Sequence, residues 1–233
     1  MLPGSPYNTR QSPTSVRRDA WVEVSLTALE HNLKLVKSWL QKDTDSASTS
    51  QNSDNGQKVK VTKDKAAKVM AVVKSDAYGH GAPSVAELFE AAGADYLGVA
   101  SIDEGTQLRA SGIKAPVLIL SPTPSWALDT ALDNKLDISV SSLKELSDVD
   151  SRAQKQNCQA RVHLKVDTGM HRLGISPSDV SSALDQIESA KALKLVSVFS
   201  HLACASDLSA VQMQDRIFKD VVALASKDAQ IFF

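Results

Sequence analysis

Strand-like and helix-like segments alternate along this chain, and this alternation restricts the possible folds more than any other feature of the sequence. Such units, each about 20–35 residues long, form parallel sheets with right-handed crossover connections. A (β/α)8 barrel and a doubly wound sheet both satisfy the pattern. The predicted strands are 21–24, 68–73, 96–100, 117–120, 136–140, 162–166 and 195–200, and the predicted helices are one that begins after Ser25 and those at 84–92, 103–111, 126–132, 142–156, 178–189 and 210–225.

Polar residues near the predicted strand ends favour the barrel. Because side chains alternate along a strand, His163, Lys165 and Asp167 share one face, opposite the apolar Val162 and Leu164. If the apolar face packs against outer helices, the polar face points into the interior, which an open sheet covered on both sides would not tolerate. Barrel enzymes also build their active sites at the carboxyl ends of the strands. The sequence therefore predicts an α/β fold of the (β/α)8 TIM-barrel type.

Composition and charge exclude several classes of function. The 233 residues carry 26 Lys and Arg against 27 Asp and Glu, so they lack the positive charge expected of a nucleic-acid-binding protein. Cys158 and Cys204 are too few for a disulfide framework and have no metal-binding spacing, so no metal site is predicted. No apolar run approaches the roughly 20 residues that span a bilayer. We therefore expect a cytoplasmic protein with neither nucleic-acid nor membrane partners.

Two polar segments flank the first predicted helix. Residues 1–18 contain three prolines and three arginines but no acidic residue, which predicts a disordered leader, with an organelle transit peptide as the alternative. Residues 41–65 are rich in Ser, Thr, Asp, Asn and Lys, which are poor core residues. Because the entropy of closing a loop grows slowly with its length, they are predicted to form a surface insertion. The remainder, residues 19–233, is expected to form one barrel domain.

Two lysines end predicted strands and are candidates for a functional site. Lys74 shares a face with Met70 and Val72, so an inward-pointing face would carry its ammonium into the barrel. A buried ammonium must find a carboxylate, lose its proton or be covalently modified, and the same holds for Lys165. An unprotonated lysine is the nucleophile that Schiff-base chemistry requires. For both residues the alternative is a surface lysine whose charged end reaches solvent just beyond the strand.

Two further polar residues follow predicted strands. Arg172 lies in a turn bracketed by Gly169 and Gly174, where its guanidinium is suited to bind an anionic oxygen. A structural ion pair with Asp167 is the alternative interpretation. His201 follows the last predicted strand, and a lone histidine at such a place is more often a core residue than a catalyst.

Three long motifs, in this order and spacing, resemble those of the alanine racemase family. They are AVVKSDAYGHGA at 71–82, VHLKVDTGMHRLG at 162–174 and SHLACAS at 200–206, and WVEVSLTALEHNL at 21–33 is similar to the family's opening. Two positions depart from the family's pattern. His171 stands where glycine is usual, and Ser75-Asp76 replaces the commoner Ala-Asn.

The resemblance implies a pyridoxal 5′-phosphate enzyme, an isomerase that interconverts L-alanine and D-alanine for D-alanine biosynthesis. By this resemblance, Lys74 holds the cofactor and acts as one base at the substrate Cα, and Tyr78 lies beside the cofactor phosphate. Arg172 binds the cofactor's phenolic oxygen, Lys165 corresponds to a lysine that is often carbamylated, and His201 packs near the ring. The resemblance thus names Lys74, Arg172 and His201 as catalytic and, together with Tyr78, as cofactor-binding. It also implies a homodimer with alanine as substrate.

The resemblance further implies parts that these 233 residues do not contain. About six of the eight barrel strands are expected, and the family's second base is a tyrosine of a C-terminal β-domain, contributed across the dimer interface. The chain is therefore expected to be a fragment of such a racemase, with little or no racemase activity by itself. Two alternatives remain open: a single-domain pyridoxal-phosphate homeostasis protein without racemase activity, and a structural or regulatory remnant that binds neither cofactor nor substrate.

Overall fold

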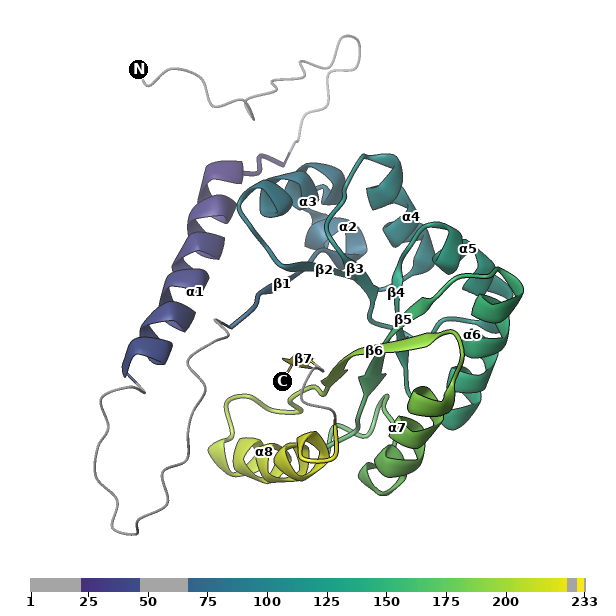
Figure 1. The fold of residues 1–233 in the computed structure, drawn as a ribbon. Helices are drawn as coiled ribbons and strands as arrows, with labels where there is room; N and C mark the ends of the chain where they lie inside the picture. Colours follow the sequence, from purple (N-terminus) through teal and green to yellow (C-terminus); the bar gives the residue numbers. More distant parts are fainter. Residues whose placement is uncertain (1–21, 47–66, 226–229, 233) are drawn as a thin grey trace, which may run out of the picture.

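A curved parallel sheet with helices on its convex side forms the body of the protein (Figure 1). The computed structural model describes residues 22–46, 67–225 and 230–232. Each strand is hydrogen-bonded to the next one in the sequence, and every pairing is parallel. The strands are β1 (Met70–Val72), β2 (Tyr96–Val99), β3 (Val117–Ile119), β4 (Asp137–Val140), β5 (Ala160–Lys165), β6 (Leu193–Phe199) and β7 (Gln230–Phe232).

Helices connect successive strands and cover the outer face of the sheet, and one further helix precedes the first strand (Figure 1). The α-helices are α1 (Leu26–Ser46), α2 (Lys74–Gly79), α3 (Ala82–Ala91), α4 (Ile102–Ala110), α5 (Leu128–Asp133), α6 (Leu143–Lys155), α7 (Val180–Ser189) and α8 (Leu208–Val222), and the 3-10 turns are η1 (Ser125–Ala127) and η2 (Pro177–Asp179). Strand residues such as Leu97 and Ile138 are buried in one apolar cluster with helix residues such as Leu146. Among the described helices, none is long and apolar enough to cross a membrane.

The strand order decides between the two topologies that the sequence allows. The strands follow one another in a single direction around the sheet, as in a (β/α)8 barrel, whereas a doubly wound sheet reverses its order at a switch point. Within the described residues β1 and β7 are not paired with each other, so the sheet is open between them. The incomplete TIM-barrel type of α/β fold is thus confirmed. The described residues contain seven strands, one more than the six expected. The additional strand is the short β7, which pairs with β6 at the edge of the sheet.

The first predicted strand is wrong. Residues 22–24 belong to no strand, and residue 21 lies outside the described residues. The helix expected after it is present and begins where predicted, because the hydroxyl of Ser25 accepts a hydrogen bond from the N–H of Ala28 (3.2 Å). This helix, α1, continues to Ser46, so the start of the predicted insertion 41–65 is helical. The predicted leader 1–18 and residues 47–65 lie outside the described residues.

The two faces of the strands separate as the alternation predicts. Val162 and Leu164 are buried in the apolar cluster between sheet and helices. His163 and Lys165, on the opposite face of β5, are also buried, with 0% and 7% of their surface exposed. Because both polar side chains lie on the concave side, the interior of the curved sheet contains the polar groups from which a site can be built.

Two helix starts have a similar local construction. At α4, the hydroxyl of Ser101 accepts from the N–H of Glu104 (3.3 Å), and the Glu104 carboxylate accepts from the N–H of Ser101, which is a capping box. At α6, the hydroxyl of Ser142 accepts from the N–H of Glu145 (3.2 Å), while Oε2 of Glu145 accepts from the preceding Ser141 N–H (2.6 Å). These caps fix where each helix starts after its strand.

Candidate active site

A pocket of about 730 Å³ lies on the concave side of the sheet, largely at the carboxyl ends of the strands. Its wall contains Lys74, Tyr78, Lys165, Arg172 and His201. The structure therefore brings together all five residues that the sequence singles out, although they lie up to 127 positions apart in the chain. The carboxyl ends of the strands are where TIM-barrel enzymes place their active sites.

Several apolar side chains also line the pocket. They come from β1, from β3 and the residue after it, from β6 and from α1, and are Met70, Val72, Leu118, Leu120, Phe199, Val36 and Leu40. None of them was identified from the sequence as part of a site. For Met70 and Val72 the sequence does contain a signal: side chains alternate along a strand, so these two residues lie on the same face of β1 as Lys74. Together the apolar side chains give the pocket an apolar surface beside its cationic groups.

The segment after β1 turns with the opposite hand to an ordinary helix. Four consecutive non-glycine residues, Ser75 to Tyr78, have φ between 52° and 55°. Each such residue costs about 1–2 kcal/mol relative to the right-handed conformation, so tertiary contacts must hold the turn. The N–H of Ser75 donates to Oε1 of Glu104 (2.6 Å), and the carboxylate of Asp76 accepts from the N–H of Ala82 (2.6 Å). We call residues Ser75–Tyr78 the left-handed turn.

Lys74, which precedes the left-handed turn, and Tyr78, which ends it, both line the pocket. Nζ of Lys74 lies 6.0 Å from the ring centroid of Tyr78. His80, which lies between Gly79 and Gly81 in the first motif, does not line the pocket. Its Nδ1 lies 2.8 Å from the carbonyl oxygen of Ala77 and is used within the turn.

Arg172 reaches the pocket because the chain folds back on the end of β5. The N–H of Ile175 donates to the Lys165 carbonyl (2.8 Å), and the N–H of Asp167 donates to the Ile175 carbonyl (3.0 Å). The intervening loop is therefore closed at its base, with Lys165 at one end and Arg172 near the other. We call residues 167–174 the arginine loop.

Asp167 stabilises the arginine loop but is not the partner of its arginine. Its carboxylate accepts from the N–H groups of Gly169 and His171 (both 3.0 Å) and pairs with Nδ1 of His171 at 3.4 Å. In the described residues the ion pair between Asp167 and Arg172, an alternative that the sequence left open, is not formed. The guanidinium of Arg172 is therefore available to the pocket.

The pocket is strongly cationic. Burial, and then the nearby Arg172, lower the pKa of Lys165, although Asp167 acts in the opposite direction. Burial, with the positive charges of Lys165, Arg172 and Lys74, also lowers the pKa of His201. Nζ of Lys165 lies 4.5 Å from the ring centroid of Phe199, a cation–π contact that compensates part of the burial. Such a cluster favours an anionic ligand or a chemical change that removes positive charge.

Replacing Lys165 with methionine is expected to stabilise the free protein. Its lowered pKa means that the ammonium is disfavoured in the folded state, so Lys165→Met should raise the free energy of unfolding by about 1 kcal/mol at neutral pH. Between the lowered pKa and the ordinary value of 10.5, the unfolded chain binds a proton that the folded chain does not, so wild-type stability rises with pH. The advantage of the variant should therefore shrink as the pH approaches 10.5.

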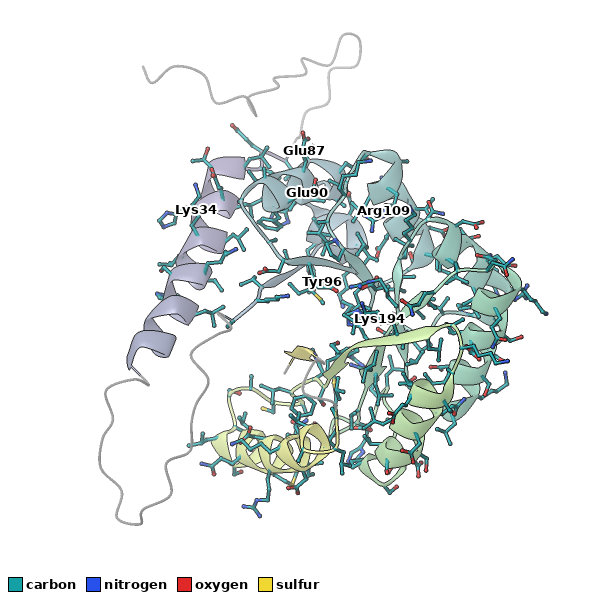
Figure 2. The ribbon with its side chains drawn as sticks, viewed as in Figure 1. Lys34, Glu87, Glu90, Tyr96, Arg109 and Lys194 are labelled. Carbon is teal, nitrogen blue, oxygen red and sulfur yellow. The ribbon has the colours of Figure 1, made fainter. Side chains whose placement is uncertain are left out.

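Urea unfolding in bicarbonate-free buffer at about pH 7 and about pH 10 measures this change. The control is Lys194→Met, because Lys194 is an exposed lysine on β6 (labelled in Figure 2) and its replacement should change little. A destabilised Lys165→Met protein, or a gain that does not depend on pH, would contradict the expectation.

A buried polar network holds the loop that carries His201. The side-chain amide of Gln214, on α8, donates to the His201 carbonyl (3.1 Å) and to the hydroxyl of Thr168 (3.0 Å). Its carbonyl oxygen accepts from the N–H of Ala203 (2.9 Å), and the Thr168 and Ser200 hydroxyls are 2.7 Å apart. Gln214 thus connects the arginine loop to the segment after β6. His201 is exposed and lines the pocket, so the alternative of a buried core histidine does not hold.

A second polar network fills the interior near the amino ends of the strands. The Asp137 carboxylate accepts from Nε of Arg161 (2.9 Å), lies 3.0 Å from Nε2 of His163 and accepts from the Tyr96 hydroxyl (3.3 Å). Nδ1 of His163 lies 2.6 Å from the Ser197 hydroxyl. Burial, and then the negative charge of Asp137, raise the pKa of Tyr96 (labelled in Figure 2) to about 12. These contacts are structural, so His163 supports the barrel and does not enter the pocket.

The sequence matches the family model described as alanine racemase, N-terminal domain, over residues 48–232. It is 37% identical over 190 residues to alanine racemase 1 of Oceanobacillus iheyensis, a match that covers 82% of this chain and 44% of that protein. It is 43% identical over 166 residues to the alanine racemase of Thermobifida fusca, covering 69% and 44% of the two chains. The chain therefore spans less than half the length of these relatives.

Solved structures of racemases share the fold of this chain. The alanine racemase of a D-cycloserine-producing Streptomyces lavendulae superposes with a TM-score of 0.72 at 30% identity, covering 88% of this chain and 49% of that one. The histidine racemase of Leuconostoc mesenteroides superposes with a TM-score of 0.73 at 25% identity, covering 90% of this chain and 51% of the other.

Proposed function

Since the chain belongs to the family of alanine racemase N-terminal domains, we propose that its pocket binds pyridoxal 5′-phosphate covalently through Lys74 and serves the racemisation of alanine. The observation that carries this proposal is the shared wall formed by Lys74, Tyr78, Lys165, Arg172 and His201. The matched relatives are racemases by name, which favours the racemase over the homeostasis protein that the sequence left as an alternative.

The residues present fit the proposed cofactor. Lys74 would supply the primary amine for the cofactor's aldehyde carbon, and their condensation would release water. The apolar surface of Met70, Leu118 and Phe199 suits a flat aromatic ring, while the cationic side of the pocket suits the anionic oxygens of the cofactor. When bound, pyridoxal phosphate supplies an electron sink that makes the Cα–H bond of an amino acid acidic.

The chain's own residues then have separable tasks. When it is not engaged in holding the cofactor, Nζ of Lys74 would be the base that removes or returns the Cα proton on one face of the substrate. Arg172 would donate hydrogen bonds to the cofactor's phenolic oxygen, and Tyr78 would lie on the side of its phosphate. The lowered pKa of His201, caused first by burial, favours its neutral imidazole, which could pack near the ring without adding charge.

Carbamylation of Lys165 would remove the unfavourable charge in the pocket. The ammonium of Lys165 would first lose one proton, and the neutral amine would then add to the carbon of CO₂ and lose a second proton. The two steps together convert a cation into an anion. Since Arg172 already influences Lys165 electrostatically, the carbamate would pair with the guanidinium and hold it toward the cofactor. This gives the buried lysine a role beyond packing.

Racemisation also needs a base on the opposite face of the substrate. We propose that a full-length racemase supplies it as a tyrosine of a second domain, across a homodimer interface, in the cytoplasm. Alanine is the proposed substrate because the curated relatives described above are named for it. The histidine racemase shares the fold at similar coverage, so the fold alone does not favour alanine.

The proposal is tested by incubating the 233-residue chain with pyridoxal phosphate, reducing with borohydride and mapping the labelled peptides. A pyridoxyl label on the peptide that contains Lys74 is the expected result. A label confined to other lysines, or no label beyond that of a denatured control, would contradict the proposal and favour the remnant that binds no cofactor.

A further inference from the structure

We propose that Glu104 is a positioning residue for Lys74: its carboxylate bridges the end of β2 and the left-handed turn, and thereby fixes the direction in which Lys74 enters the pocket. This inference rests on the proposed function of Lys74. It adds a residue from α4, which does not line the pocket, to the machinery that makes the lysine reactive.

The two oxygens of Glu104 bind two different parts of the chain. Oε1 accepts from the N–H of Ser75 at 2.6 Å, one residue after Lys74. Oε2 accepts from the N–H groups of Ala100 at 2.7 Å and of Ser101 at 3.3 Å, at the end of β2. Since β2 is the hydrogen-bonded neighbour of β1, the carboxylate joins the strand end beside the lysine to the first residue of the turn that follows it.

Comparison with Glu145 shows that the bridge is more than a helix cap. Glu145 occupies the equivalent position at the start of α6, and its carboxylate accepts from the N–H and the hydroxyl of Ser141, both within its own cap. Capping α4 by a similar scheme requires one oxygen of Glu104. The other oxygen binds the lysine segment 29 residues earlier in the sequence.

The left-handed turn needs such an external contact. Its non-glycine residues would relax to a right-handed conformation in the absence of tertiary bonds. The N–H of its first residue, Ser75, donates to Glu104. Its second residue, Asp76, accepts from the N–H of Ala82, which lies beyond the turn. Because Lys74 directly precedes the turn, loss of the Glu104 contact would free the backbone that orients the lysine side chain.

The test compares Glu104→Gln with Glu145→Gln in the full 233-residue chain. An amide has one acceptor oxygen, so the new side chain at position 104 can accept from Ser75 or from the end of β2, but not from both, and its NH₂ then faces a backbone N–H. The amide introduced at position 145 can accept from the Ser141 N–H and donate to the Ser141 hydroxyl, so that cap survives. Both variants probe a helix cap, but only Glu104→Gln breaks the bridge to the lysine.

The first measurement needs no cofactor. We expect the amide of Ser75 to exchange with solvent about tenfold faster or more in Glu104→Gln than in wild type, because one neutral oxygen shared between Ser75 and the end of β2 holds this N–H less strongly than the carboxylate does. In Glu145→Gln the exchange of this amide should be unchanged. Equal exchange of this amide in the three proteins would overturn the inference.

The second measurement is the rate at which pyridoxal phosphate and borohydride label Lys74, recorded against pH. We expect labelling about tenfold slower in Glu104→Gln than in Glu145→Gln, at matched thermal stability. Labelling of Lys74 at the same rate in both variants would overturn the inference. If wild type acquires no label on Lys74, the proposed function fails, and the exchange of the Ser75 amide still decides whether Glu104 holds the turn.

Discussion

Lys74→Ala is expected to abolish the specific incorporation of pyridoxal phosphate into the pocket. Lys74 is the pocket lysine placed by the left-handed turn, and removal of its amine leaves no nucleophile at that position. Label at the corresponding peptide should fall to background, and the affinity for the cofactor should fall by about 100-fold or more, since the covalent bond is lost. Borohydride trapping with peptide mapping, and a titration by fluorescence, measure the two effects.

Lys68→Ala is the matched control for this experiment. Lys68 is an exposed lysine that also lines the pocket, just before β1, and its loss should leave the label on Lys74 intact. Undiminished labelling of the pocket in Lys74→Ala would show that another lysine is the anchor. Equal loss in both variants would point to a general electrostatic attraction of the phosphate, without a specific covalent bond.

Gly174→Ala is expected to lower the free energy of unfolding by about 3 kcal/mol or more. Gly174 has φ of 138°, and an added Cβ would lie 2.7 Å from the carbonyl carbon of Val166 and against the backbone nitrogen of Asp167. These are backbone atoms at the closed base of the arginine loop, so neither can move without breaking the bonds of Ile175. The loop that carries Arg172 should therefore lose its position along with stability.

Gly112→Ala separates backbone strain from the clash. Gly112 also has a positive φ, 92°, but an added Cβ there would meet nothing within 4 Å. Its replacement should cost about 1 kcal/mol, the strain alone. The difference between the two variants in urea unfolding measures the close approach at Gly174, and equal costs would refute that account.

The architecture was predictable because its signals are local. Each strand from β1 to β6 begins within three residues of its expected start, since apolar runs bounded by helical periodicity specify strands directly. The expected strand at 21–24 failed because apolar alternation over so few residues also occurs in segments that only lead into a capped helix. No local signal separates the two when the strand would need a partner elsewhere in the chain.

The residues of the candidate site could be predicted from the sequence, but the contacts that position them could not. Lys74, Lys165 and Arg172 stood out because charged residues followed buried strands. The hand of the turn after Lys74 could not be deduced, because nothing in Ser75-Asp76-Ala77-Tyr78 favours a left-handed conformation over an ordinary one. The motif Ser101-x-x-Glu104 predicts a helix start, but the second use of its carboxylate depends on tertiary contacts.

The left-handed turn has a consequence for protein engineering. A hexapeptide copied from residues 74–79 into another scaffold carries no preference of its own for this shape, so the transplanted lysine would point wherever the host's backbone takes it. A designer who wants the same chemistry in a new barrel must therefore move two distant pieces together, the lysine segment and the acidic side chain one strand further on. The smallest portable unit of this site is discontinuous in the gene.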